Sequence, residues 1–315
     1  MLSRVANSLY WMCRYIERAE NIARFVDVNL NLLLDLPYQE TEQWDPLVII
    51  TGDNEIFKQK YGEPNRDNVI QFLTFDTTYD NSIISNLQKA RENARSVREI
   101  ISTEMWEQIN KYYFFVNDAS SQSEIPENLY EFYNKTKLES HLFTGIMDTT
   151  MSHGEGWHFG RIGRLLERAD KTSRILDVKY FILLPSVDMI GGPIDYIQWA
   201  ALLKSASALE MYRKRYRRIL PDNVADFLIM DDDFPRSLRY CLINSQNSLR
   251  DITGSSHGTY QNSAERYLGK LSSELDYSQI DEIIKMGLHE FLDKFQYDLN
   301  IVGNSIHKTF FEVEI

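Results

Sequence analysis

Apolar residues recur along residues 9–33 at alternating intervals of three and four, the spacing of an amphipathic helix. This stripe consists of Leu9, Met12, Ile16, Ala19, Ala23, Val26, Leu30 and Leu33. A second stripe with the same spacing consists of Phe159, Ile162, Leu166, Ala169, Ser173, Leu176, Tyr180 and Leu183. Ser3 is a suitable N-cap for the first helix and Pro37 a suitable stop. The pattern therefore predicts two helices that are long enough to run through a bundle.

The rest of the chain shows helical periodicity as well. Further helices are predicted at residues 82–112, 127–150, 196–218, 235–252 and 279–303. The alternation of apolar and polar residues that is typical of strands is almost absent, and only residues 310–315, FFEVEI, hint at extended structure. We therefore expect an all-α helical bundle.

Part of the first long helix reappears in the second. Residues 14–28, RYIERAENIARFVDV, match residues 164–178, RLLERADKTSRILDV, at seven of fifteen positions. A second block repeats at an offset of 155 and pairs Phe72, Leu73, Asp76, Ser82, Leu87 and Arg95 with Phe227, Leu228, Asp231, Ser237, Leu242 and Arg250. A period near 150 is long enough for each copy to hold its own core. We therefore expect a tandem duplication with repeats at 1–150 and 151–315 and the two long helices at the centre.

The repeated helix carries a charged patch on the face opposite its apolar stripe. Tyr10, Phe25 and Val28 fall on the same face, which indicates that a second layer of helices buries it. Because each copy places two arginines around one glutamate, the patch needs a partner of opposite charge. The six residues of this candidate cluster are Arg14, Glu17, Arg18, Arg164, Glu167 and Arg168.

Two interpretations of this cluster remain open. In the structural one, the copies pack about a pseudo-twofold axis, so that Glu17 meets Arg168 while Glu167 meets Arg18. In the functional one, the guanidinium groups hold a bound carboxylate or phosphate. The pairs Glu20–Arg24 and Asp170–Arg174 have i,i+4 spacing, and we expect them to be ordinary helix-surface pairs.

A basic run in the second half is a further candidate for binding an anion or a partner. Its cations are Arg213, Lys214, Arg215, Arg217 and Arg218. Runs of like charge are usually solvated helix faces, which is the alternative interpretation.

Glu155 and His158 have the Glu-x-x-His spacing of di-iron bundles. The first copy has no histidine in the corresponding region, and a di-metal bundle needs the motif twice, so these two residues are weak candidates and we expect no metal or other cofactor. No phosphate-binding glycine loop and no Gly-x-Ser-x-Gly motif is present in the sequence.

Composition narrows the class of protein. The formal net charge is −12, which argues against general nucleic-acid binding. Cys13 and Cys241 form no metal-type spacing and no disulfide framework, so we expect a reducing cytoplasm. No window is apolar enough to predict a membrane span or an export signal.

Five segments of the sequence resemble the Alpha-E family of bacterial all-helical proteins, whose members are typically tandem duplications with a Glu-Arg motif. The resemblance rests on residues 2–29, on FLTFD (72–76) with residues 82–99, on residues 156–180 and on FPRSLRYCL (234–242). The family's marked positions correspond to Glu17-Arg18 and Glu167-Arg168.

The resemblance implies membership of a peptide synthesis or modification system, together with circularly permuted ATP-grasp ligases, transglutaminase-like proteins and an Ntn-type peptidase. We therefore expect an accessory or partner protein that contributes binding rather than bond-making. One alternative is an enzyme that binds a carboxylate or phosphate substrate at the paired Arg-Glu clusters, with Glu17 or Glu167 as acid or base. Another is a helical-bundle metalloenzyme that uses Glu155 and His158.

Overall fold

The computed structural model describes residues 1–35, 44–121, 125–181 and 191–312. Every regular element within these ranges is a helix, which confirms the all-α prediction. The helices before residue 151 are α1 (Ser3–Asp35), α2 (Asp45–Thr51), α3 (Asn54–Tyr61), α4 (Arg66–Ile70), the π-helix η1 (Gln71–Phe75), α5 (Ile83–Ser96), α6 (Thr103–Ser120) and α7 (Leu129–Thr150).

The second part of the chain has a similar series of helices. They are α8 (Glu155–Phe181), α9 (Pro193–Ser205), α10 (Leu209–Arg215), α11 (Pro221–Met230), α12 (Leu238–Thr253), α13 (Ser263–Asp276), α14 (Ile280–Met286), α15 (Leu288–Ile306) and the π-helix η3 (His307–Phe311). None of the helices described has the combination of length and apolar character that crossing a membrane requires.

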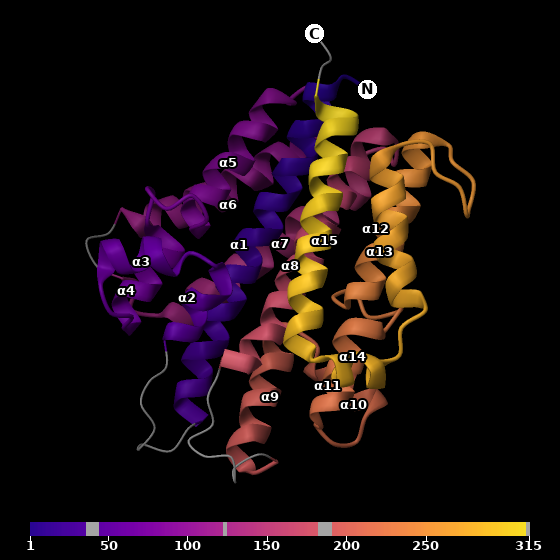
Figure 1. Ribbon diagram of the computed structural model, residues 1–315. Helices are drawn as coiled ribbons and strands as arrows, with labels where there is room; N and C mark the ends of the chain where they lie inside the picture. Colours follow the sequence, from indigo (N-terminus) through magenta and orange to yellow (C-terminus); the bar gives the residue numbers. More distant parts are fainter. Residues whose placement is uncertain (36–43, 122–124, 182–190, 313–315) are drawn as a thin grey trace.

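The two longest described helices, α1 with 33 residues and α8 with 27, pack against each other. Figure 1 shows them in the middle of the molecule with α15 in front, while α2–α6 lie on one side and α10–α14 on the other. The N-terminus and the last described residues lie at the same end of the molecule. Buried apolar residues from both parts of the chain form one connected core. The repeat boundary at 150 and the tandem duplication itself stay predictions.

The apolar stripes that predicted the long helices form much of this core. Leu9, Met12, Ala19, Ala23 and Val26 of α1 are completely buried. The corresponding positions of α8 are buried too, from Phe159 through Leu176. The side chains of Leu33 and Tyr180, and the whole of Pro37 and Leu183, lie outside the part that the structure describes.

Glycines let α1 and α8 approach closely. A Cβ atom on Gly163 would lie 2.3 Å from the carbonyl oxygen of Tyr10, and one on Gly160 would lie 3.0 Å from the Sγ of Cys13. Tyr10 and Gly160 are 150 residues apart, as are Cys13 and Gly163, so the two contacts correspond under the repeat. This is the geometry that packing about a pseudo-twofold axis predicts.

Several predicted helices are interrupted or shifted. The helix predicted at 82–112 is wrong between Val97 and Ser102, because Val97 and Ile101 turn into the core and Ser102 caps a new helix by accepting from the Met105 amide. The chain reverses at this point, and α6 packs back against α5. The helix predicted at 127–150 is present as α7.

The later helix predictions need similar corrections. The helix predicted at 196–218 is broken at Ser207, whose positive φ of 50° is incompatible with an α-helix, and it ends at Arg215. The helix predicted at 279–303 is split at Gly287, where φ is 108° and glycine is favoured. The helix predicted at 235–252 begins only at Leu238, after the cap Ser237. Phe310 and Phe311 are helical rather than extended, and residues 313–315 lie outside the described residues.

Candidate functional site

The glutamates of the two long helices form ion pairs across the α1–α8 contact. Glu167 of α8 accepts hydrogen bonds from the Nε of Arg18 at 2.6 Å and from the Nε of Arg14 at 2.8 Å. Glu17 of α1 accepts from the Nε and a terminal nitrogen of Arg168, both at 2.8 Å. Both carboxylates are buried, with 1% and 0% of their side-chain surface exposed. These are the reciprocal pairs that pseudo-twofold packing predicts.

The surroundings keep both glutamates ionised. Burial alone would raise the pKa of Glu17, but attraction to Arg168 and Arg236 outweighs it and lowers the pKa below its ordinary value. Burial likewise opposes ionisation of Glu167, whereas Arg18 and Arg14 hold its pKa well below the usual range. At neutral pH neither glutamate carries a proton to donate.

Arg164 does not mirror its counterpart Arg14. Its Nε atom is buried and has no hydrogen-bond partner among the described residues. Burial and the nearby charge of Arg168 lower the pKa of Arg164, while Asp148 partly opposes this effect. Five of the six candidate residues thus form the ion pairs, and Arg164 lies beside them.

Glu20 belongs to the same buried system, so the prediction that it forms an ordinary surface pair is wrong. It is 1% exposed and binds Arg24 at 2.6 Å. It also accepts from Ser140 at 2.8 Å, lies 3.0 Å from the Nε2 of His141 and pairs with Arg236. The α1 spacing identified only Arg24, because the other partners come from α7 and from the turn before α12. We call this set, together with Glu17, Asn21 and Arg168, the Glu17 network.

The corresponding set around α8 differs in its partners. Lys171 lies 2.9 Å from Asp170 and 3.5 Å from Glu167, and Arg174 lies 3.0 Å from Asp170. With Arg14 and Arg18, these residues form what we call the Glu167 network.

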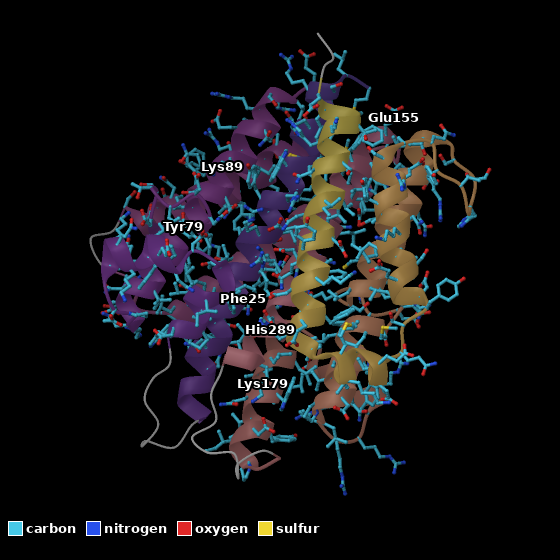
Figure 2. The ribbon with its side chains drawn as sticks, in the orientation of Figure 1. Phe25, Tyr79, Lys89, Glu155, Lys179 and His289 are labelled. Atoms are coloured by element: carbon cyan, nitrogen blue, oxygen red, sulfur yellow. The ribbon has the colours of Figure 1, made fainter. Side chains whose placement is uncertain are left out.

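Two cavities of about 200 Å³ and 310 Å³ adjoin the Glu167 network. Arg14, Arg18, Asp170 and Asn300 line both of them, so the two cavities adjoin; we call each cavity a chamber and the two together the cationic cleft. Figure 2 labels Tyr79, which lines the smaller chamber.

Sequence reasoning missed the residues that α7 and α15 bring to the networks. A third repeat was the available signal: LYEF at 129–132 and LHEF at 288–291 match at an offset of 159. At this offset His141 aligns with Asn300 in the sequence. His141 contacts Glu20, and Asn300 lines the cationic cleft. The short match is easy to overlook in a chain with many similar helices.

The basic run does not join either network. Its five cations are all exposed at the end of α10 and in the segment that follows, and Arg215 pairs with Asp231. This placement agrees with a solvated surface.

The weak metal candidates Glu155 and His158 have separate partners. Glu155 binds the N-terminal amine of Met1 at 2.7 Å, and the Nε2 of His158 lies 3.7 Å from Asp251. Neither belongs to a group of three metal-ligand side chains among the described residues.

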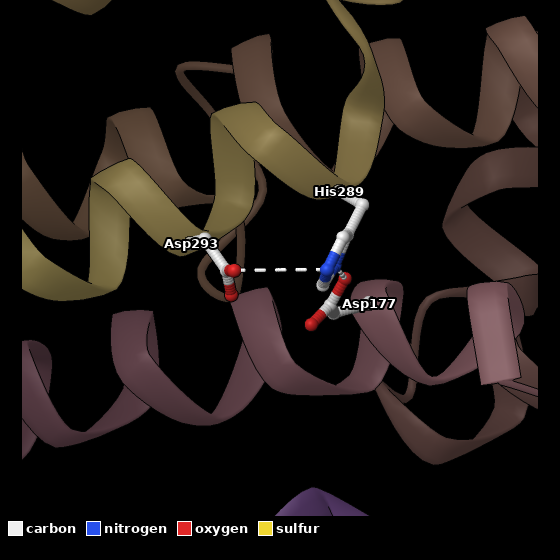
Figure 3. Close-up of side chains that lie close together, drawn as sticks. All are labelled: Asp177, His289 and Asp293. Carbon is white, nitrogen blue, oxygen red and sulfur yellow. Dashed lines mark hydrogen bonds and ion pairs between the residues drawn. The ribbon is translucent and has the colours of Figure 1, made fainter.

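Another group does bring three such side chains together, as Figure 3 shows. The Nδ1 of His289 lies 2.7 Å from Asp177, and its Nε2 lies 3.6 Å from Asp293. The hydrogen bond with Asp177 raises the pKa of His289. Because both ring nitrogens face carboxylates, the group acts as a link between α8 and the start of α15.

The fold and the site together define an all-helical protein whose two longest described helices are joined by buried Glu-Arg pairs. The Alpha-E family, described as a predicted alpha-helical domain with a conserved ER motif, matches residues 1–311, and the chain belongs to this family. The match includes Glu17-Arg18 and Glu167-Arg168.

The chain is also similar to uncharacterised mycobacterial proteins. One from Mycobacterium bovis is 24% identical over 298 residues, which cover 89% of this chain and 33% of that protein. One from Mycobacterium tuberculosis is 23% identical with the same coverage. The chain thus spans about a third of the length of these curated relatives. No solved structure gives a significant match.

Proposed function

We propose that this protein is a non-catalytic partner of an ATP-dependent peptide synthesis or modification system that includes ATP-grasp-type ligases and transglutaminase-like proteins. The proposal of a non-catalytic role rests on one observation: arginines of the same chain already bind both glutamates of the motif. Both glutamates of the motif are buried and bound by guanidinium groups, at 2.6–2.8 Å for the closest contacts. Their chemistry suits the joining of two helices.

Catalysis by these glutamates would need a different environment. A general acid or base works best when its pKa lies near the working pH and its carboxyl group can reach the substrate. The pKa values of Glu17 and Glu167 are lowered instead, and their side chains are covered. These properties favour a structural role for the motif and a binding role for the surface around it.

The relatives give a second argument for a partner role. The region that matches this chain is only 33% of their length, so it is joined to a much larger amount of other chain. A covalent connection holds two units together at a high effective concentration. We infer that an Alpha-E unit that is covalently joined to further sequence in some proteins binds separate proteins where it is not joined to them.

Co-purification tests the proposal. A tagged copy of this chain would be produced in cells that also make the ATP-grasp-type and transglutaminase-like proteins, and its complexes would be isolated. We expect at least one of these proteins to be retained in a defined stoichiometry. A tagged helical protein of similar size and charge serves as the control. Loss of all association under gentle conditions, with a folded protein, would count against the proposal.

A further inference from the structure

The Glu17 and Glu167 networks occupy corresponding places in the two repeats but are filled differently. Arg236 and Asn81 are 155 residues apart, and each directly precedes the serine that caps the next helix. Arg236 reaches Glu17 at 3.2 Å and also pairs with Glu20. Asn81 is shorter; it accepts a hydrogen bond from Arg18 at 2.7 Å and donates one to Asp53. The space that Arg236 fills in one network is therefore not filled by its counterpart in the other.

Two other replacements enlarge the same space. His141, which contacts Glu20 in the Glu17 network, corresponds to the shorter Asn300 in the third repeat. Glu20 itself corresponds to the shorter Asp170. Asp170 and Asn300 line both chambers of the cationic cleft. The cleft thus lies where the Glu17 network has long side chains, and the exposed Asn300 makes it reachable from solvent.

The charges around this space favour an anion. Four cations, Arg14, Arg18, Lys171 and Arg174, line the cleft. Three carboxylates act on them: Glu167 and Asp170 of the Glu167 network, and Asp53, which is near Arg174 and accepts hydrogen bonds from Tyr79 and Asn81. Beside the Glu17 network, Asp148 acts on Arg164.

The counterpart of Asp148 at an offset of 159 is His307, which lines the larger chamber. At this position the larger chamber therefore has an imidazole in place of a carboxylate. The surplus of one positive charge matches a ligand with one carboxylate group, which paired guanidinium groups bind well.

The larger chamber adds an organic surface. Tyr10, Trp11, Leu299 and Phe311 line it together with Arg14, whose guanidinium lies 4.9 Å from the Trp11 ring centroid. Each chamber is larger than the roughly 30 Å³ that one water molecule occupies in the liquid. A lone inorganic ion would leave the aromatic part of the cleft unused. The shape fits a ligand with an anionic end and an organic body.

We propose that the cationic cleft binds the C-terminal carboxylate of a peptide. Arg18, Lys171 and Arg174 would face the carboxylate, and the peptide body would lie along Trp11 and Phe311. The choice of a peptide as the ligand body rests on the proposed function, whereas the choice of an anion rests on the cleft alone. The Glu17 network, which is already filled, would bind no such ligand.

Calorimetric titration of the full chain tests this site. The probes are N-acetyl-Ala-Ala-Glu, the same peptide with a C-terminal glutamine, the glutamine peptide as its amide, and inorganic phosphate. We expect both acid peptides to bind at least tenfold more tightly than the amide. The affinity for the acid peptides should also rise as the salt concentration falls, because the contact is ionic.

A substitution at Asn300 separates the site from general charge effects. Asn300→Glu places a carboxylate at the cleft. The affinity for the glutamate peptide should therefore fall at least tenfold, and the melting temperature of the unliganded protein should rise. The control Asn134→Glu makes the same change at an exposed position of α7 that lines neither chamber and should alter affinity less than twofold. A folded Asn300→Glu variant that behaves like the control would overturn the proposal.

The remaining outcomes distinguish the two proposals. Equal binding of acid and amide peptides, or no binding of any probe, would reject the anion site whatever the result of co-purification. Preferential binding of phosphate would reject the peptide carboxylate as the ligand and leave the partner role to be judged by co-purification. Binding of the acid peptide by a chain that associates with no ligase would keep the site and reject the partner role.

Discussion

Glu17 lies between Arg168 and Arg236 in the core, where each charge depends on the others. Glu17→Gln removes the negative charge and leaves the two guanidinium groups without it, which costs about 3–5 kcal/mol for a buried pair. Urea denaturation followed by circular dichroism measures the loss in the free energy of unfolding. Glu92→Gln, at an exposed residue that pairs with Arg95, is the control and should cost at most about 1 kcal/mol. Equal losses in the two variants would show that the buried pair does not stabilise the fold.

The same carboxylates give stability a defined dependence on pH. The pKa values of Glu17 and Glu167 are lower in the folded protein than the ordinary value of 4.5. Their stabilisation is therefore fully present above pH 4.5 and is lost as the pH falls below that value towards their folded pKa values.

Melting temperatures between about pH 3 and pH 7 would check this dependence. We expect the wild type to lose stability on acidification more steeply than Glu17→Gln, which lacks one of the titrating groups. Parallel curves would mean that other carboxylates control the acid transition.

At this scale the repeat in the sequence predicted the pairs Glu17–Arg168 and Glu167–Arg18 as one of two interpretations, and the structure contains both pairs. It was not sufficient for Glu20, because helical spacing reveals only the partners on the same helix. Ser140, His141 and Arg236 approach Glu20 from other helices, and their approach depends on how those helices pack.

Among the elements, the contact between α1 and α8 has a specific steric requirement. Gly163→Ala would place a methyl group 2.3 Å from the Tyr10 carbonyl oxygen, and backbone cannot move away as a flexible side chain can. We expect a loss of about 1–3 kcal/mol or more, as for other overpacked cores.

Gly145→Ala is the matched control, because nothing lies within 4 Å of a Cβ atom at this helical position of α7. Alanine is favoured over glycine inside a helix, so this change should be neutral or stabilising by about 0.5–1 kcal/mol. Thermal denaturation of both variants checks the pair of predictions. A Gly163→Ala protein as stable as Gly145→Ala would contradict the close packing described for α1 and α8.

Periodicity predicted the existence of the helices better than their ends. The predicted helices ran through Val97, Ser207 and Gly287, although α5 ends just before Val97 and the backbone has a positive φ at the other two residues. Ser207 has a positive φ without being glycine, and its Oγ interacts with Arg24 of α1. A contact between distant segments therefore accompanies this break, and a local pattern does not contain that information.

For the whole molecule, the sequence indicated two similar halves, whereas the structure gives one connected core with α15 lying along α8. The cationic cleft belongs to this level of organisation. It results from small differences at Asn81, Asp170 and Asn300 relative to their counterparts in the other repeat. The three-dimensional packing of the helices is needed to show that these three positions lie around the cleft.

The most direct test of the partner role measures ATP turnover by a purified ATP-grasp-type ligase from the same cells, with and without this protein and with an acidic peptide as acceptor. We predict a stable complex and a severalfold increase in turnover with the wild type, and a smaller increase with Asn300→Glu than with Asn134→Glu. Unchanged turnover and the absence of a complex, with every protein folded, would contradict the account.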